Sequence, residues 1–77
     1  MDVHDTLTRF LSTEAGRPLG PDDDYFELGL VNSLFALELV SFVERQFGLV
    51  VEVEDLELDH FRTIDRLTGF VLARTAA

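Results

Sequence analysis

The sequence predicts an all-α fold, a small four-helix bundle of three main helices and one short helix. Three stretches, at about 2–15, 33–47 and 63–74, repeat apolar residues at the spacing of one helix face. The first connection, at about 16–31, is long, and the strand-like stretch 49–51 has no partner strand, so we expect an extended link there. Amphipathic helices that must bury their apolar faces in one short chain form a bundle.

The first and last helices each show one apolar stripe and a signal at one end. Gly16 ends the first helix, because glycine readily takes the left-handed backbone of a helix end. Thr63 or Arg62 precedes the last helix, and the Asp65 carboxylate suits the positive end of its dipole. The stripes are Val3, Leu7, Phe10 and Leu11 in the first helix, and Ile64, Leu67, Phe70 and Val71 in the last.

The two connections have different compositions. The first contains two prolines and three consecutive acids, and its apolar residues, Tyr25 among them, are expected to hold it on the core. A connection of this length is often functional. The second carries five acids and no base between Glu52 and Asp59, followed by a short helical turn at about 58–62. A negative face that steers basic partners is expected from Glu38, Glu44, Glu52, Glu54, Asp55 and Glu57. The alternative for the later run is that it only confers solubility.

The middle helix, Ser33 to Phe47, has the strongest pattern and two apolar sets. Asn32 is a good N-cap because its side-chain oxygen can accept from an amide of the first turn. The expected core stripe is Ala36, Leu39, Val40, Val43 and Phe47. Phe35 is rotated about 100° from Ala36, so we expect it to be exposed and to bind partners. The expected partner-binding set is Leu34, Phe35, Leu37 and Glu38. The alternative is that Leu30 or Val31 covers Phe35.

Length and composition exclude several classes of protein. Seventy-seven residues make one domain, with a small core. A net charge of −9 argues against binding to nucleic acid or to an anionic membrane. The chain has no cysteine, which fits a reducing cytoplasm, and its N-terminus lacks the features of a secretory signal. We therefore expect a single domain over 1–77, cytoplasmic and monomeric.

Catalysis and metal binding are not expected. A hydrolase that used Ser33 with His4 or His60 would also need a positioned third group and an oxyanion hole. The acidic runs do not follow the EF-hand spacing, so solvated acids are the simpler interpretation. Ser33 is notable for its position instead, since a phosphoryl group at a helix start meets free amides and the positive end of the dipole. The alternative is that Ser33 only caps the helix.

The stretch from Asp24 to Leu34, Asp-Tyr-Phe-Glu-Leu-Gly-Leu-Val-Asn-Ser-Leu, resembles the signature of acyl carrier proteins. The helical layout matches that family along essentially the whole chain. The resemblance implies an acyl-carrier-like four-helix fold in which Ser33 bears 4′-phosphopantetheine, whose thiol holds an acyl group as a thioester. It also implies a phosphopantetheinyl transferase, a loading enzyme, tailoring enzymes and acyltransferase or synthase modules as partners.

Two departures from the signature concern recognition by the transferase. Asn32 stands where the family usually has Asp, and one extra residue lies between Gly29 and Ser33. The runs 29–36 and 59–64 resemble free-standing carriers that load a glyceryl unit, later converted to hydroxymalonyl or methoxymalonyl extender units in polyketide and nonribosomal pathways. The alternatives are a carrier of fatty acyl, D-alanyl or other aminoacyl groups, or a protein-interaction bundle without a cofactor.

Overall fold

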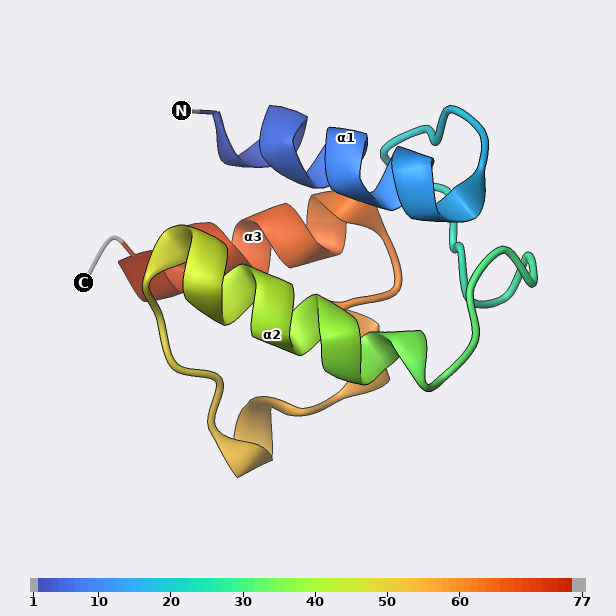
Figure 1. The fold of residues 1–77 in the computed structure, drawn as a ribbon. Coiled ribbons are helices and arrows are strands. Elements are labelled where there is room, and N and C mark those ends of the chain that lie inside the picture. Colours follow the sequence, from blue (N-terminus) through green and yellow to red (C-terminus); the bar gives the residue numbers. More distant parts are fainter. Residues whose placement is uncertain (1, 76–77) are drawn as a thin grey trace.

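The computed structural model describes residues 2–75, and this part of the chain is helical without any strand. Helices α1 and α3 lie side by side, α2 lies in front of α3, and the second connection hangs below (Figure 1). The elements are α1 (Val3–Ala15), α2 (Phe35–Phe47), η1 (Val53–Asp55), η2 (Leu58–His60) and α3 (Ile64–Thr75). The all-α prediction is confirmed. The short helical turn expected at about 58–62 is present as the 3-10 turn η2 and not as a fourth α-helix, and η1 is a second 3-10 turn before it.

The helix ends follow the signals in the sequence. The Asp2 side chain caps α1 by accepting from the amide of His4 at 3.0 Å. Gly16 ends α1 at φ 75°, in the left-handed region that glycine tolerates. The hydroxyl of Thr63 accepts from the amide of Arg66 at 3.1 Å and so caps α3. Among residues 2–75, no helix combines the length and the apolar character needed to cross a bilayer.

The core lies between the three helices and includes Leu19 and Tyr25 of the first connection, as well as Phe61 just before α3. The α1 and α3 stripes contribute as predicted, although Val3 and Phe10 are only half-buried. Burying each large apolar side chain contributes about 1.5–3 kcal/mol. The fully buried side chains are Leu7, Leu11, Tyr25, Leu39, Val43, Ile64, Leu67 and Val71.

The prediction that Phe35 is exposed is wrong. Its side chain is 8% exposed, and its ring stacks 5.8 Å from that of Phe10 on α1. The buried face of α2 is Phe35, Leu39 and Val43, whereas Ala36, Val40 and Phe47 of the expected stripe are half-buried. Two apolar columns run along α2, and Phe10 of α1 stacks on Phe35, which begins the buried one. Phe35 is therefore a core residue.

The first connection, residues 16–34 or the long loop, is fastened to the chain just before α3. The hydroxyl of the buried Tyr25 donates a hydrogen bond to the carbonyl of Phe61. Burial, and secondarily the charge of Asp24, raises the pKa of Tyr25 well above its ordinary value, so the hydroxyl keeps its proton. Arg62 adds an ion pair with Asp24 at 2.9 Å and one with Asp59 at 2.7 Å. The contact with Asp59 is also a hydrogen bond, whereas Arg62 Nε, which lies near Asp24, forms no hydrogen bond.

The second connection, residues 49–63, is called the linker below. Acids of the linker itself and one acid of α2 hold it in place. Asp55 pairs with Arg74 of α3, and Glu44 of α2 accepts from the amide of Val51 at 2.9 Å. Glu52 and Asp55 form a reciprocal capping box around η1. The sequence left open whether these acids steer partners or only confer solubility, and in the structure they also hold the linker against α2 and α3.

Replacing Phe35 by alanine tests the corrected core. We expect Phe35→Ala to lower the free energy of unfolding by about 3–5 kcal/mol, because a buried aromatic ring is lost and a cavity remains. Leu34→Ala is the matched control, since Leu34 is 73% exposed and its loss should change stability little. Urea denaturation followed by circular dichroism measures both. Equal stability of the two variants would contradict the burial of Phe35.

Candidate functional site

Ser33 lies in an exposed turn that joins the long loop to α2. The amide of Ala36 donates to the carbonyl of Ser33 at 3.2 Å, and the amide of Leu37 donates to that of Leu34 at 3.2 Å. Each of these bonds spans three residues, as in a 3-10 turn, and not the four of an α-helix. The α-helix therefore begins at Phe35, two residues after the start expected from the sequence. Ser33 is exposed in this turn, at the N-terminal end of α2.

Asn32 performs the capping role expected of it. Its side-chain oxygen accepts from the amide of Phe35 at 3.0 Å, which fixes the first turn and leaves Asn32 exposed beside Ser33. The amides of Phe35, Ala36 and Leu37 already donate to Asn32, Ser33 and Leu34, so the feature that favours an anion here is the partial positive charge at the N-terminal end of α2. A phosphodiester on the Ser33 hydroxyl would lie at this end of the helix, where a negative charge is stabilised.

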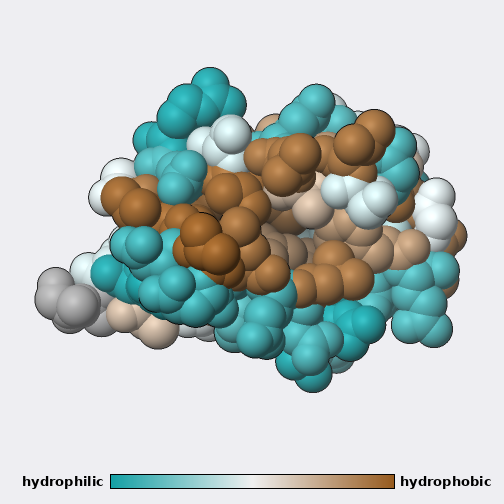
Figure 2. Space-filling view, turned by 90° about the horizontal axis from the view of Figure 1, so that it is seen from below, coloured by the Kyte–Doolittle hydropathy of each residue, from teal (hydrophilic) through white to brown (hydrophobic). Residues whose placement is uncertain are grey.

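Of the other predicted neighbours of Ser33, all except Phe35 are exposed. Leu34 and Leu37 are 73% and 67% exposed, and Glu38 is exposed as well. The linker adds apolar residues that the sequence analysis did not single out, of which Val53 is the most exposed at 80%. The pattern that could have identified them in the sequence is the mixture of apolar residues and acids from 53 to 58. Seen from below, the surface shows apolar side chains gathered around a hollow (Figure 2).

Two grooves flank α2. The first, called the linker groove, has a volume of about 230 Å³ and walls that are almost wholly apolar. It is lined by Ala36, Leu37, Val40, Leu56, Glu57, Leu58 and Phe61.

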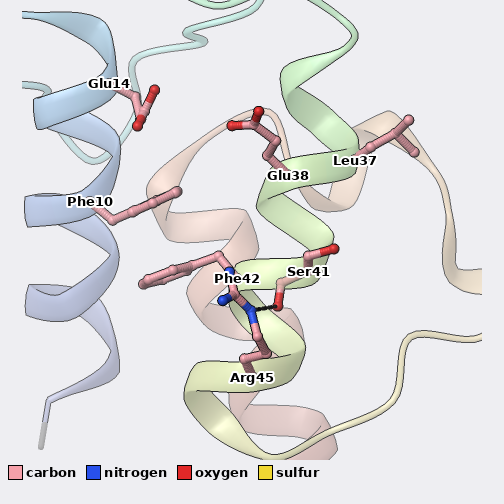
Figure 3. Close-up of a pocket in the computed structure, with 7 residues that line it drawn as sticks. All are labelled: Phe10, Glu14, Leu37, Glu38, Ser41, Phe42 and Arg45. Atoms are coloured by element: carbon pink, nitrogen blue, oxygen red, sulfur yellow. Dashed lines mark hydrogen bonds between the residues drawn. The ribbon is translucent and has the colours of Figure 1, made fainter.

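The second groove, called the α1 groove, lies between α1 and α2. It consists of two hollows, of about 410 and 340 Å³, that share Glu14 and Glu38. The hollow nearer to Ser33 is lined by Leu30, Val31, Asn32, Leu34 and Phe35, together with the two shared residues. The other is shown in Figure 3 and adds Phe10, Leu37, Ser41, Phe42 and Arg45.

The histidines have partners away from Ser33. His4 lies 3.1 Å from Asp65, and the ring of His60 lies 5.2 Å from that of Phe70. Within residues 2–75, no hydrogen bond joins Ser33 to a histidine, and no group of three His, Cys, Asp or Glu side chains could hold a metal ion. Asp23 and Asp24 accept hydrogen bonds from backbone amides of the long loop.

Comparison with known proteins finds one family model and several relatives that match most of the chain. A family model described as "Phosphopantetheine attachment site" matches residues 3–71. The D-alanyl carrier protein of Leuconostoc mesenteroides is 29% identical over 73 residues, which cover 92% of this chain and 94% of that protein. The D-alanyl carrier protein of Bacillus velezensis is 28% identical over 68 residues, which cover 88% and 86% of the two chains.

Proposed function

Since residues 3–71 match its family model, this chain belongs to the phosphopantetheine-attachment family of carrier proteins, and we propose that Ser33 bears the 4′-phosphopantetheine arm. Members of this family are carriers and not enzymes. The arm, when bound, supplies a thiol that holds an acyl group as a thioester. The observation that carries the assignment is the exposed hydroxyl of Ser33 at the N-terminal end of α2, next to the Asn32 cap.

The two other serines are poorer candidates. The hydroxyl oxygen of Ser12 accepts from the amide of Leu19 at 3.2 Å and so holds the beginning of the long loop. Ser41 is exposed but lies in the middle of α2, where the backbone amides are used by the helix itself. Ser33 alone of the three combines an exposed hydroxyl with the positive end of a helix dipole.

The surface around Ser33 suits partners that carry basic and apolar groups. Leu34 and Leu37 present apolar side chains beside the carboxylate of Glu38. Glu54 and Glu57 on the linker are exposed as well. The net charge of −9 adds a negative potential that attracts basic partners. We expect a phosphopantetheinyl transferase and acylating or synthase enzymes to approach this side.

The cargo we favour is a small polar unit. The resemblance of the runs 29–36 and 59–64 to glyceryl-loading carriers supports an extender unit of polyketide biosynthesis. The names of the relatives support a second candidate, D-alanyl. Both units have three carbons and polar groups, so either would be a short cargo that favours contact with water. A fatty acyl chain would need an apolar cavity such as the linker groove, of about 230 Å³, and we expect that groove not to take up a chain.

Attachment at Ser33 predicts a defined change of mass. Coexpression with a broad-specificity phosphopantetheinyl transferase should add one phosphopantetheine to the wild type, because the hydroxyl of Ser33 is accessible. Ser33→Ala should gain nothing, whereas Ser12→Ala and Ser41→Ala should still be modified. Intact-mass spectrometry reads all four proteins. Modification of Ser33→Ala would overturn the assignment.

Cargo size predicts how loading affects thermal stability. The transferase can load glyceryl, alanyl and octanoyl groups directly from their coenzyme A thioesters. A buried chain contributes about 0.8 kcal/mol per CH₂, and ~1 kcal/mol raises the Tm of a domain this size by ~4–8 °C. We expect octanoyl to raise the Tm no more than glyceryl does. A rise of several degrees with octanoyl alone would identify a carrier of longer chains.

A further inference from the structure

Ser33 lies between Asn32 and Leu34, which line the α1 groove, and three residues before Ala36, which lines the linker groove. Leu34, Glu38, Ser41 and Arg45 follow one another at spacings of four, three and four residues, which places them on one face of α2, along the α1 groove. Ala36 and Val40 line the linker groove. An arm on Ser33 could lie along either side, so the chemistry of the grooves decides between them.

The α1 groove combines apolar and polar groups. The rings of Phe10 and Phe42 stack with their centres 3.8 Å apart, and they point toward each other from the two helices (Figure 3). Glu14 and Glu38 extend from the same two helices into the space between them (Figure 3). Neither carboxylate forms an ion pair or a hydrogen bond within residues 2–75, although Arg45 lines the same hollow.

Pantetheine has the same mixture of groups. Its two amides and its hydroxyl donate hydrogen bonds that Glu14 and Glu38 can accept, and its two methyl groups suit Leu30, Val31 and Leu34. The linker groove offers Glu57 as its single charged lining residue, and burying unpaired amides against apolar walls is unfavourable. Ser41 lies eight residues beyond Ser33, ~12 Å along the helix, a span that an extended arm covers.

We infer that the α1 groove is a binding site for the pantetheine arm and its cargo when that cargo is short and neutral or positively charged. The inference rests on the proposed attachment at Ser33. Glu14 and Glu38 accept hydrogen bonds from the hydroxyls of a glyceryl group or pair with the ammonium of an alanyl group. The same two carboxylates repel a cargo that carries a carboxylate of its own. Such a cargo stays outside the groove and is displayed to partner enzymes.

Nuclear magnetic resonance of the loaded protein tests this site. Glyceryl, alanyl and malonyl groups are attached as stable amide analogues of the arm to ¹⁵N-labelled protein, and intact mass with peptide mapping establishes loading at Ser33. We expect glyceryl and alanyl to shift the amide signals of Glu14, Glu38 and Phe42 several-fold more than those of Val40 and Leu56. The malonyl analogue should shift only residues adjacent to Ser33.

A charge-neutral variant tests the selection by charge. In E14Q/E38Q the groove keeps its shape, so the malonyl analogue should now produce the shifts at Phe42 that glyceryl produces in the wild type. E57Q, on the linker groove, is the matched control and should leave the malonyl pattern unchanged. Exclusion of malonyl from E14Q/E38Q would overturn the role of the two carboxylates.

Two further outcomes would overturn the site itself. Shifts at Val40 and Leu56 with glyceryl would place the arm in the linker groove, and shifts confined to residues 31–35 with every cargo would mean that the arm is not bound. Loading found at a residue other than Ser33 would instead contradict the proposed function. The mass measurement therefore separates failure of the attachment site from failure of the groove.

Discussion

The hydrogen bond from the buried Tyr25 hydroxyl to the Phe61 carbonyl fixes where the long loop runs. Ser33 lies near the end of a nineteen-residue connection, residues 16–34. A connection of that length with no contact to the core would sample many conformations, so the path of the chain into α2 would not be defined. The aromatic ring of Tyr25 fills the core while its hydroxyl satisfies a backbone acceptor, so packing and polar pairing act at one point. Arg62 strengthens the same junction through Asp24 and Asp59.

The sequence predicted α1 and α3 well because each has one apolar stripe, and a single stripe leaves one choice of buried face. On α2 two apolar columns compete, and periodicity cannot tell which one the neighbouring helix covers. The error at Phe35 follows from this ambiguity, since the approach of Phe10 decides it and Phe10 is twenty-five residues away in the sequence. The Asn32 cap and the exposure of Ser33 were predicted correctly because both depend on nearby residues, although α2 itself begins two residues after Ser33.

The linker was the least predictable part of the chain. Its acids predict that the linker is exposed to solvent, and its apolar residues predict that it is buried. Neither prediction alone describes the linker. Asp55 binds Arg74, whereas Val53 two residues earlier is largely exposed. The linker thus presents apolar side chains next to α2 while its acids fasten it, and this arrangement forms the linker groove. Such a pairing depends on contacts between distant residues, which a single sequence does not show.

The central claim is that the fastened loop presents Ser33 for attachment of the arm, and the rate of arm transfer to Tyr25→Phe tests it most directly. The variant leaves the Phe61 carbonyl unpaired at a cost of about 1–3 kcal/mol, and Val71→Ala supplies a control destabilised at a buried position of α3. With both variants kept folded, the account predicts slower transfer from the phosphopantetheinyl transferase to Tyr25→Phe than to Val71→Ala or the wild type. Equal rates for all three proteins would contradict it.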